Sequence, residues 1–464
     1  MQPYLNLKDV IRKYVTRPLA IAGIAGALSW GNLSYGNRFC RDDIAVNTYK
    51  EGWQGRPDAA MDEKGDVIIT WDSLYQDGSW LGIYAQRFDR ELNKVGEEFQ
   101  INSYTEDNQH TPQVTMDSEG NFLMTWQNQA DWKIHAQRFD RNGNRIGDEF
   151  RAGTAESEER NPRMAVDSEG NFLVVFTRAV STGRGAYART FDKGGNPLGS
   201  EFEIDGYERR IGMYPDGDFV VTDTDGGGNA LYAYRYGKDG DRVGGTLLVS
   251  LSKSDGLDSE LDNSSVALSD YGFMVVWEDY DDRDSHSIGL FARRFSRDVN
   301  EAGEEFRVNR YTQDEQIYPD IAMDKEGNFV ITWLNWNHYM ADVYAQRFNR
   351  EGNRIGGEFK VNTYPFYLLS HGGPRVAMNK SRDFVITWDG AGEEDGQGIY
   401  ARRFYFYSPA DFNHNGEVDF SDFAGLAGDW QKTGQGLPGD ITKDGRVDYN
   451  DLQTLAGYWL YAGD

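Results

Sequence analysis

The segment Gln113-Val-Thr-Met-Asp-Ser-Glu-Gly-Asn-Phe-Leu-Met-Thr-Trp126 decides the fold of this chain, because it returns throughout the sequence. Similar stretches end at Trp71, Trp333 and Trp388. Each is followed by the motif Ala-x-Arg-Phe, which occurs seven times in strict or looser form, and the repeats start about 53 residues apart. A repeat of roughly 40–50 residues with four short strands is typical of a β-propeller blade.

One repeat predicts four strands, which we name A to D. Strands A, B and C are expected over 112–116, 122–126 and 134–139, and strand D from Glu149 onward. The A–B and C–D connections are short and rich in Asn and Gly, as tight hairpin turns require. The D–A and B–C loops vary in length and content, so we expect function on the face that carries them.

The two ends of the repeat array complement each other. The seventh repeat stops at Phe404 without its strand D, whereas Asp43-Ile-Ala-Val-Asn-Thr-Tyr49 reads as that missing strand. The sequence therefore predicts a mainly-β chain with a seven-bladed β-propeller over 43–408, closed by its N-terminal strand. Closure removes free sheet edges. The repeat resembles one that is common in large secreted bacterial proteins, which implies no settled activity.

Composition excludes several classes of protein. The 464 residues include 75 Asp and Glu against 48 Lys and Arg, a net charge of -27, and nucleic-acid binding needs the opposite sign. A single Cys excludes an intrachain disulfide framework. The 53 glycines against 12 prolines fit a protein with many tight turns.

The N-terminus predicts a signal peptide over 1–36. Four bases precede an apolar run of ten residues from Leu19 to Leu28, which is too short to span a bilayer. We therefore expect a secreted protein, extracellular or attached to the cell surface, without a membrane span. A disordered cytosolic N-terminus is the alternative.

Two sets of propeller residues are candidate ligand-binding residues. The first consists of tryptophans in the D–A or B–C loops, outside the repeated core: Trp53, Trp80, Trp132 and Trp336. Exposed aromatic rings stack on sugars, so we expect a polysaccharide or a glycoprotein glycan as partner. The alternative is that these rings pack on one another.

The second set consists of the residue at the start of strand A in each repeat. Two positions further on, each repeat has a small residue, as the crowded region near the axis requires. Its charged members are Asp58, Arg163, Arg210, Asp320 and Arg375. Residues two apart share one side of a strand, so this set is expected to ring the channel mouth. The arginines would hold a carboxylate or sulfate of an acidic sugar. The alternative is an Arg–Asp ring that satisfies itself.

The C-terminus carries two loops with calcium-ligand spacing. The first loop predicts the ligands Asp411, Asn413, Asn415, Glu417 (by its carbonyl), Asp419 and Asp422. The second predicts Asp440, Thr442, Asp444, Arg446 (by its carbonyl), Asp448 and Asp451. A glycine stands at position 6 of each loop, and short helices are expected over 423–430 and 452–460.

These tandem loops resemble a type I dockerin over residues 409–464. The resemblance implies two Ca²⁺ ions, calcium-dependent folding and a cohesin-like partner. Positions 10 and 11, which carry partner specificity in better-known dockerins, are Phe420-Ser421 and Tyr449-Asn450. They lack the Ser-Thr pair of that group and leave the partner open.

The sequence favours a secreted glycan-binding propeller, tethered through the dockerin-like module, that contributes to polysaccharide degradation or adhesion. Whether it is an enzyme stays open, and its catalytic residues are unknown. A polysaccharide lyase with His338 or Tyr339 as base, or a glycosidase, is the alternative. Carboxylates for the glycosidase would come from Asp72, Glu278, Asp279 and Asp389. A non-catalytic extracellular scaffold component is the second alternative.

Overall fold

The structure is a computed structural model of the chain. It describes residues 43–460 except 181–182, 207–209, 226–227, 253–260, 281–287, 300–301, 368–371, 392–396, 406–419, 435–436, 438 and 443–444. The predicted signal peptide and the first predicted calcium loop up to Asp419 lie outside the described residues. Residues Asp43–Phe404 form one compact unit, and the described residues from 420 onward belong to a second.

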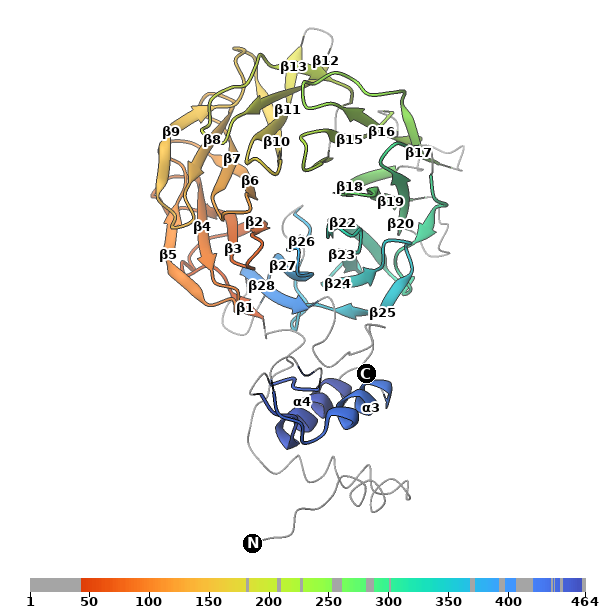
Figure 1. The fold of residues 1–464 in the computed structure, drawn as a ribbon. Coiled ribbons are helices and arrows are strands. Elements are labelled where there is room, and N and C mark those ends of the chain that lie inside the picture. The colour runs from red at the N-terminus through yellow and green to blue at the C-terminus, as the bar shows by residue number, and fades with distance from the viewer. Residues whose placement is uncertain are drawn as a thin grey trace. The chain divides into compact units, whose positions relative to one another are not determined.

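The described residues of the first unit form seven antiparallel four-stranded sheets arranged as the blades of a propeller (Figure 1). Blade 1 contains β2 (Gln54–Met61), β3 (Val67–Leu74), β4 (Leu81–Phe88) and β5 (Lys94–Gln100). Blade 2 contains β6 (Gln109–Met116), β7 (Phe122–Asn128), β8 (Lys133–Phe139) and β9 (Arg145–Arg151). Blade 3 contains β10 (Glu159–Val166), β11 (Phe172–Val180), β12 (Gly183–Phe191) and β13 (Phe202–Ile204). Blade 4 contains β14 (Arg210–Met213), β15 (Phe219–Thr224), β16 (Ala230–Tyr236) and β17 (Leu247–Leu251).

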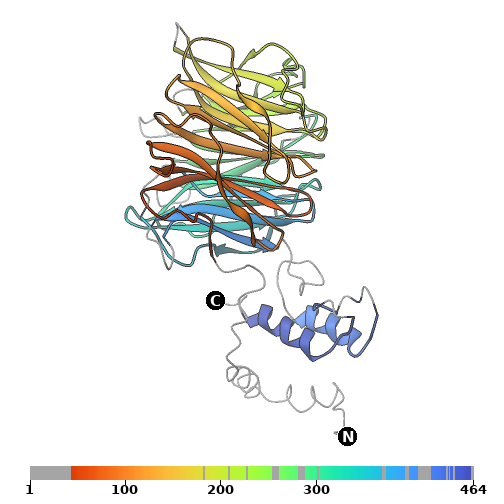
Figure 2. The ribbon, with the colours of Figure 1, turned by 90° about the vertical axis from the view of Figure 1, so that its left-hand side faces the viewer.

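The remaining blades repeat this order. Blade 5 contains β18 (Leu261–Ser269), β19 (Gly272–Asp279), β20 (Gly289–Ser296) and β21 (Phe306–Arg307). Blade 6 contains β22 (Glu315–Met323), β23 (Phe329–Trp336), β24 (Ala341–Phe348) and β25 (Arg354–Lys360). Blade 7 contains β26 (Arg375–Met378), β27 (Asp383–Gly390) and β28 (Gly398–Tyr405), and its outer strand is β1 (Ile44–Ala45). Strand A of each blade lies nearest the axis, and seen from the side the strands run between the two faces of the ring (Figures 1 and 2).

The N-terminal strand closes the ring, as the sequence predicts. Ile44 pairs with Ala401 and Ala45 with Tyr400 in antiparallel register. The Val46 N–H donates to the Ile399 carbonyl (2.8 Å). Val46 is buried in one hydrophobic cluster with Trp71 of blade 1 and Val385 of blade 7, so hydrophobic packing adds to strand pairing at the junction.

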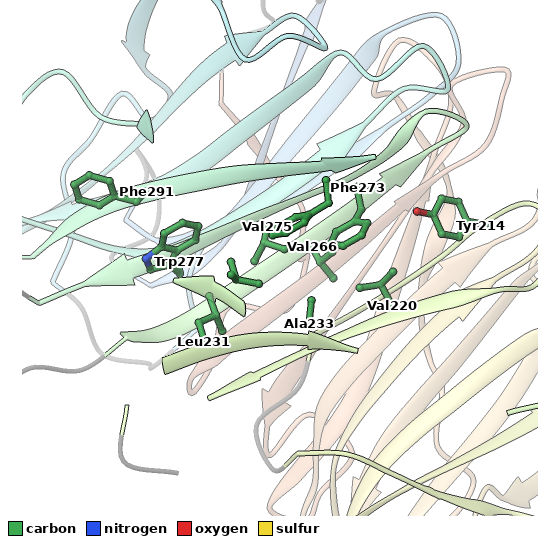
Figure 3. Close-up of a cluster of buried hydrophobic side chains, with 11 residues drawn as sticks. Tyr214, Val220, Leu231, Ala233, Val266, Phe273, Val275, Trp277 and Phe291 are labelled. Atoms are coloured by element: carbon green, nitrogen blue, oxygen red, sulfur yellow. The ribbon is translucent and has the colours of Figure 1, made fainter. Parts of the chain in front are cut away.

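The repeated tryptophans are core residues. Trp71, Trp126, Trp277, Trp333 and Trp388 are among the largest fully buried side chains. They pack between neighbouring blades, and Figure 3 shows Trp277 of blade 5 in a cluster with Leu231 and Val220 of blade 4. Strand B is buried on both faces because each blade is covered by two neighbours.

Acidic residues of the outer strands fasten neighbouring blades to one another. The Glu149 carboxylate of blade 2 accepts the Ser103 N–H that follows blade 1 (2.8 Å). Glu358 of blade 6 accepts the N–H of Tyr311 (2.9 Å), which follows blade 5. These carboxylates accept hydrogen bonds from backbone N–H groups that strand pairing leaves free. Part of the negative charge of the chain therefore stabilises the fold.

The described residues of the C-terminal unit include two short helices, α3 (Phe420–Asp429) and α4 (Tyr449–Leu460). Leu426, Val447 and Leu455 form their buried core. Both helices begin three residues before the predicted starts. In α4 the Asp448 carboxylate accepts the N–H of Asn450 (2.8 Å) and thereby caps the helix. Among the described residues no helix has the length and apolar character needed to cross a membrane.

Candidate functional site

A β-bulge shapes the start of strand A and was not predicted. In blade 2 the strand begins at Gln109 rather than 112, and its register shifts between His110 and Gln113. The residue inside the bulge has a positive φ in five blades, although none of these residues is glycine. They are Arg56 (51°), Thr111 (54°), Asn161 (54°), Asn263 (42°) and Tyr318 (55°). Such backbone costs energy and persists only where the surroundings hold it.

Buried carboxylates hold these bulges in place. The Asp72 carboxylate of blade 1 is fully buried and pairs with the Arg56 Nε at 2.7 Å. Glu278 of blade 5 accepts the N–H of Tyr318 in blade 6. Both were candidates for glycoside hydrolysis, but the Arg56 ion pair of Asp72 and the Tyr318 hydrogen bond of Glu278 give them a structural role. Burial raises the pKa of Asp72 to about 7, although Arg56 opposes the shift.

The D–A loops are fastened at their base by an Asn–Gln pair. The Asn102 side-chain oxygen accepts the N–H of Ile83 (2.8 Å), and its Nδ2 donates to Gln109 (3.1 Å). Blade 5 repeats the arrangement through Asn309, whose Nδ2 donates to the Gln316 side chain (2.8 Å). The loops that were expected to carry function are therefore held rigidly where they leave the sheet.

Aromatic side chains gather on the face that these loops form, which we call the loop face. Eight of the exposed aromatic residues among those described lie in its D–A and B–C loops: Tyr75, Trp80, Tyr104, Trp132, Tyr311, Tyr339, Tyr364 and Tyr367. On the opposite face, formed by the A–B and C–D turns, the same set of described residues places Tyr271. The rings are distributed unequally between the two faces, although the fold repeats evenly around the axis.

The four predicted tryptophans differ in their exposure. Trp80 is 56% exposed and lies 5.8 Å from the ring of Tyr75, whereas Trp132 is 40% exposed and stacks on Arg160 at 5.0 Å. Trp53 and Trp336 are half-buried. Trp53 contacts the Arg56 guanidinium at 5.3 Å. Trp80 and Trp132 therefore offer the larger free ring surfaces of the predicted set.

A half-buried histidine lies within the electrostatic reach of two arginines in the same region. Burial, together with the positive charges of Arg56 and Arg160, lowers the pKa of His110 to about 4. Both ring nitrogens of His110 are buried without a hydrogen-bond partner. His110 is thus a neutral imidazole at pH 7. His110 belongs to β6, and no sequence pattern marks Arg56 and Arg160 as its neighbours.

Blade 6 brings one predicted lyase candidate next to a carboxylate. His338 is largely exposed, and its Nε2 lies 3.5 Å from the Glu315 carboxylate. Its ring also meets Trp336 edge-on, with centroids 5.0 Å apart. Tyr339 follows with 77% of its surface exposed. The sequence did not single out Glu315, because one acid in a chain with so many has no distinguishing pattern.

The predicted channel-mouth residues come together around the axis. Asp58, Arg163, Arg210, Asp320 and Arg375 lie at equivalent positions on the innermost strands (Figure 1), and all five are half-buried. The Arg375 Nε lies 4.0 Å from the Asp58 carboxylate. Burial raises the pKa of Asp58 to about 6, which Arg375 opposes and the charge of Asp320 reinforces. The five charges therefore act on one another as a single group, which we call the inner ring.

The second predicted calcium loop is described except for 443–444. The Gly445 N–H donates to the Asp440 carboxylate (2.8 Å), and Gly445 has a φ of +83° that favours glycine. The Asp451 carboxylate accepts bonds from the Thr442 N–H (2.9 Å) and hydroxyl (3.0 Å). These oxygens accept hydrogen bonds from the loop itself, and the described residues contain no group of three or more His, Cys, Asp or Glu side chains that could hold a metal ion, so calcium binding stays a prediction. Asp444 and all predicted ligands of the first loop except Asp422 lie outside the described residues.

Comparison with known proteins identifies the fold. No protein-family profile and no curated protein sequence matches this chain. An ulvan lyase of polysaccharide lyase family PL25 superposes with a TM-score of 0.51 and 10% identity over 77% of this chain and 95% of its own. The same enzyme bound to a repeat of glucuronic acid and rhamnose 3-sulfate superposes with a TM-score of 0.50, 10% identity and coverages of 78% and 95%.

A protein of unknown function from Dyadobacter fermentans matches 79% of this chain and 99% of its own, with a TM-score of 0.46 and 10% identity. At such identities the likeness concerns the fold alone. The chain is thus a mainly-β seven-bladed propeller whose fold is shared with a polysaccharide lyase.

Proposed function

We propose that the propeller binds a polysaccharide on its loop face, and that residues 409–464 tether it to a cohesin-like partner outside the cell. The observation that carries the binding proposal is the unequal distribution of exposed aromatic rings between the two faces. Core packing gains nothing from Trp80 at 56% exposure, whereas a sugar ring stacks on such a surface. The shared fold of an ulvan lyase bound to its saccharide supports a glycan as ligand.

Affinity electrophoresis of the purified protein through gels that contain single polysaccharides tests this proposal. We expect retardation by at least one polysaccharide, and its loss in Trp80→Ala. Tyr271→Ala is the matched control, because Tyr271 is equally exposed (54%) on the opposite face. Equal retardation of Trp80→Ala and wild type on every gel would contradict the role of this ring. Migration unaffected by a broad panel would favour the scaffold alternative.

The tether rests on the second loop and on the resemblance of the tandem loops to a dockerin. Asp440 and Asp451 supply carboxylates, and Gly445 allows the tight turn between them. Bound Ca²⁺ would neutralise these carboxylates and fix the loop against α4. Calorimetric titration of the full chain with Ca²⁺ should give two saturable sites in wild type and one in Asp451→Ala. An unchanged stoichiometry would overturn the assignment of this loop.

Polysaccharide lyase activity is the second candidate, and the His338–Glu315 contact favours it. In such a reaction His338 takes the proton alpha to a uronate carboxylate, and that electron pair forms a carbon–carbon double bond. The C–O bond to the leaving sugar then breaks, and its oxygen takes a proton from Tyr339 or from water. Incubation with uronate polysaccharides and detection of unsaturated products tests this candidate. Product formation that persists in His338→Gln would exclude His338 as the base.

A further inference from the structure

The inner ring carries more positive than negative charge in a half-buried position. Three arginines stand against two aspartates among its charged members. All five occupy the position after the bulge in strand A, or its equivalent in β14 and β26, and strand A is the strand of each blade that lies nearest the axis (Figure 1). The mutual effects on their pKa values place them within electrostatic reach of one another across several blades.

The two aspartates serve the fold. One Asp58 oxygen accepts the Val114 N–H of the next blade at 2.8 Å. Asp320 accepts the Ser265 hydroxyl at 3.0 Å and the Val376 N–H of blade 7 at 2.9 Å. Each aspartate therefore fastens strand A of the following blade. Their negative charge reaches the arginines at a distance, the shortest recorded contact being the 4.0 Å between Asp58 and Arg375.

The arginines lack comparable partners. The Arg163 Nη1 donates to the carbonyl of the adjacent Pro162 (2.8 Å), and its Nε is buried without a hydrogen-bond partner. Within the described part of the chain Arg163 makes no ion pair. Arg210 donates to the Ser264 carbonyl (3.2 Å) and Arg375 to the Pro374 carbonyl (3.3 Å). Carbonyls satisfy donors but leave the charges of Arg163 and Arg210 uncompensated, whereas Arg375 has the Asp58 carboxylate at 4.0 Å.

This arrangement disfavours the charged forms of Arg163 and Arg210, as their pKa values show. Burial lowers the pKa of Arg210 to about 10 and that of Arg163 well below its ordinary value. Repulsion from neighbouring arginines adds to both shifts. A cluster selected for stability alone would place an acid opposite Arg163, because a lone buried charge is costly. An anion in the ring would supply that missing negative charge.

We propose that Arg163, Arg210 and Arg375 form a binding site for one compact oxyanion, a sulfate or a carboxylate group. Guanidinium groups offer paired N–H donors that match the oxygens of such groups. The anion is either a free ion or a substituent of a sugar chain, and in the second case the inference rests on the proposed function. The net charge of -27 repels anions from most of the surface, so the ring would select a local group rather than a polyanion as a whole.

Thermal unfolding of the full chain in Na₂SO₄ and in NaCl at equal ionic strength tests the site. Sulfate stabilises many proteins through preferential exclusion, so a second variant must separate that general effect from binding. We expect the sulfate-dependent rise in Tm to be clearly smaller in Arg163→Gln than in wild type. Arg189→Gln is the matched control, because Arg189 lies in the same blade and donates to the Ala152 carbonyl at 3.2 Å. It should keep the full sulfate response.

A second measurement on Arg163→Gln distinguishes an anion-binding arginine from one that stabilises the fold. In NaCl alone its Tm should equal or exceed that of wild type, because the substitution removes charge repulsion. Arg189→Gln should lower the Tm under the same conditions. Equal sulfate responses in wild type and Arg163→Gln would overturn the anion site, whatever their Tm values in NaCl.

Oligosaccharides of one length, with and without sulfate or uronate groups, distinguish the two sources of the anion. If the charged oligosaccharide binds at least tenfold more tightly than the neutral one and Arg163→Gln removes the difference, the anion is a sugar substituent. If sulfate ion raises the Tm in an Arg163-dependent way while no oligosaccharide binds, the site binds a free ion. The anion site is then confirmed and the proposed function fails. If Trp80→Ala abolishes binding of charged and neutral chains alike and Arg163→Gln changes neither sulfate response nor binding, the proposed function stands and this inference fails.

Discussion

Two groups of side chains on the loop face differ in what they contact. Asp72, Glu278 and Asn102 are buried where strands leave the sheets. Asp72 pairs with Arg56, whereas Glu278 and Asn102 each accept a backbone N–H that strand pairing leaves free. Trp80 and Tyr339 lie on the loops above, exposed over more than half of their surface. The buried polar residues at the blade ends therefore stabilise the fold, whereas the exposed rings on the loops remain available to a ligand.

Removal of a buried carboxylate should have the largest effect on stability. Asp72→Ala leaves the Arg56 charge without its partner, and loss of one member of a buried pair costs about 3–5 kcal/mol. The free energy of unfolding from urea denaturation measures this loss. Asp72→Asn keeps the shape of the side chain and removes a charge that burial disfavours, as the raised pKa of Asp72 shows, so it should lose less than Asp72→Ala. A loss below about 1 kcal/mol in Asp72→Ala would mean that the bulge does not depend on this carboxylate.

The contribution of the inner ring to the free energy of unfolding should depend on pH. The folded-state pKa of Asp58, about 6, lies above the ordinary value of 3.8, so folding favours the protonated acid. Its contribution to stability is present below pH 4 and is lost as pH rises through 6. Asp58→Asn removes this titration and should gain stability relative to wild type between pH 4 and 7, by at most about 3 kcal/mol. Urea unfolding at several pH values measures the gain, and a difference independent of pH would contradict it.

Loss of one loop fastening should have a smaller effect. Asn102→Ala removes the acceptor for the Ile83 N–H and the partner of Gln109, and an unsatisfied buried donor costs about 1–3 kcal/mol. Hydrogen exchange should show faster exchange of the Ile83 amide than in wild type. Blade 2 is the natural comparison, because after it Gly153 replaces the asparagine and the Glu159 carboxylate of blade 3 fills the space and accepts the Ile134 N–H (3.3 Å). Unchanged exchange of Ile83 would show that strand pairing alone protects this amide.

Removal of an exposed ring should have the smallest effect on stability. Trp80→Ala should change the free energy of unfolding by less than about 0.5 kcal/mol, because Trp80 contributes little to the core. The same substitution should abolish retardation by the bound polysaccharide, which separates function from folding. If Trp80→Ala unfolds at a clearly lower urea concentration, the ring is part of a loop core and the contrast between the two groups fails for this residue.

The sequence predicted more of the fold than of the site. Trp71 and Trp126 were recognised as core residues because they recur at one position of each repeat, and repetition records what every blade needs. The bulge escaped prediction, since Arg56, Thr111 and Tyr318 share no residue type that favours positive φ. The recurring proline after them, as at Pro57 and Pro112, was the available signal. Long-range partners such as His110 and Arg160 left no local pattern.

By itself the sequence determined the blade number, the closing strand and the core, because these depend on periodic hydrophobic and turn residues that can be read locally. Only the tertiary structure decided which polar residues stabilise the fold through contacts with neighbouring blades. Asp58 and Arg163 occupy equivalent positions on their strands, yet the aspartate fastens a neighbouring blade while the arginine makes no ion pair among the described residues. That distinction depends on hydrogen bonds and burial between strands distant in sequence, and it is what turns a ring of charges into a candidate anion site.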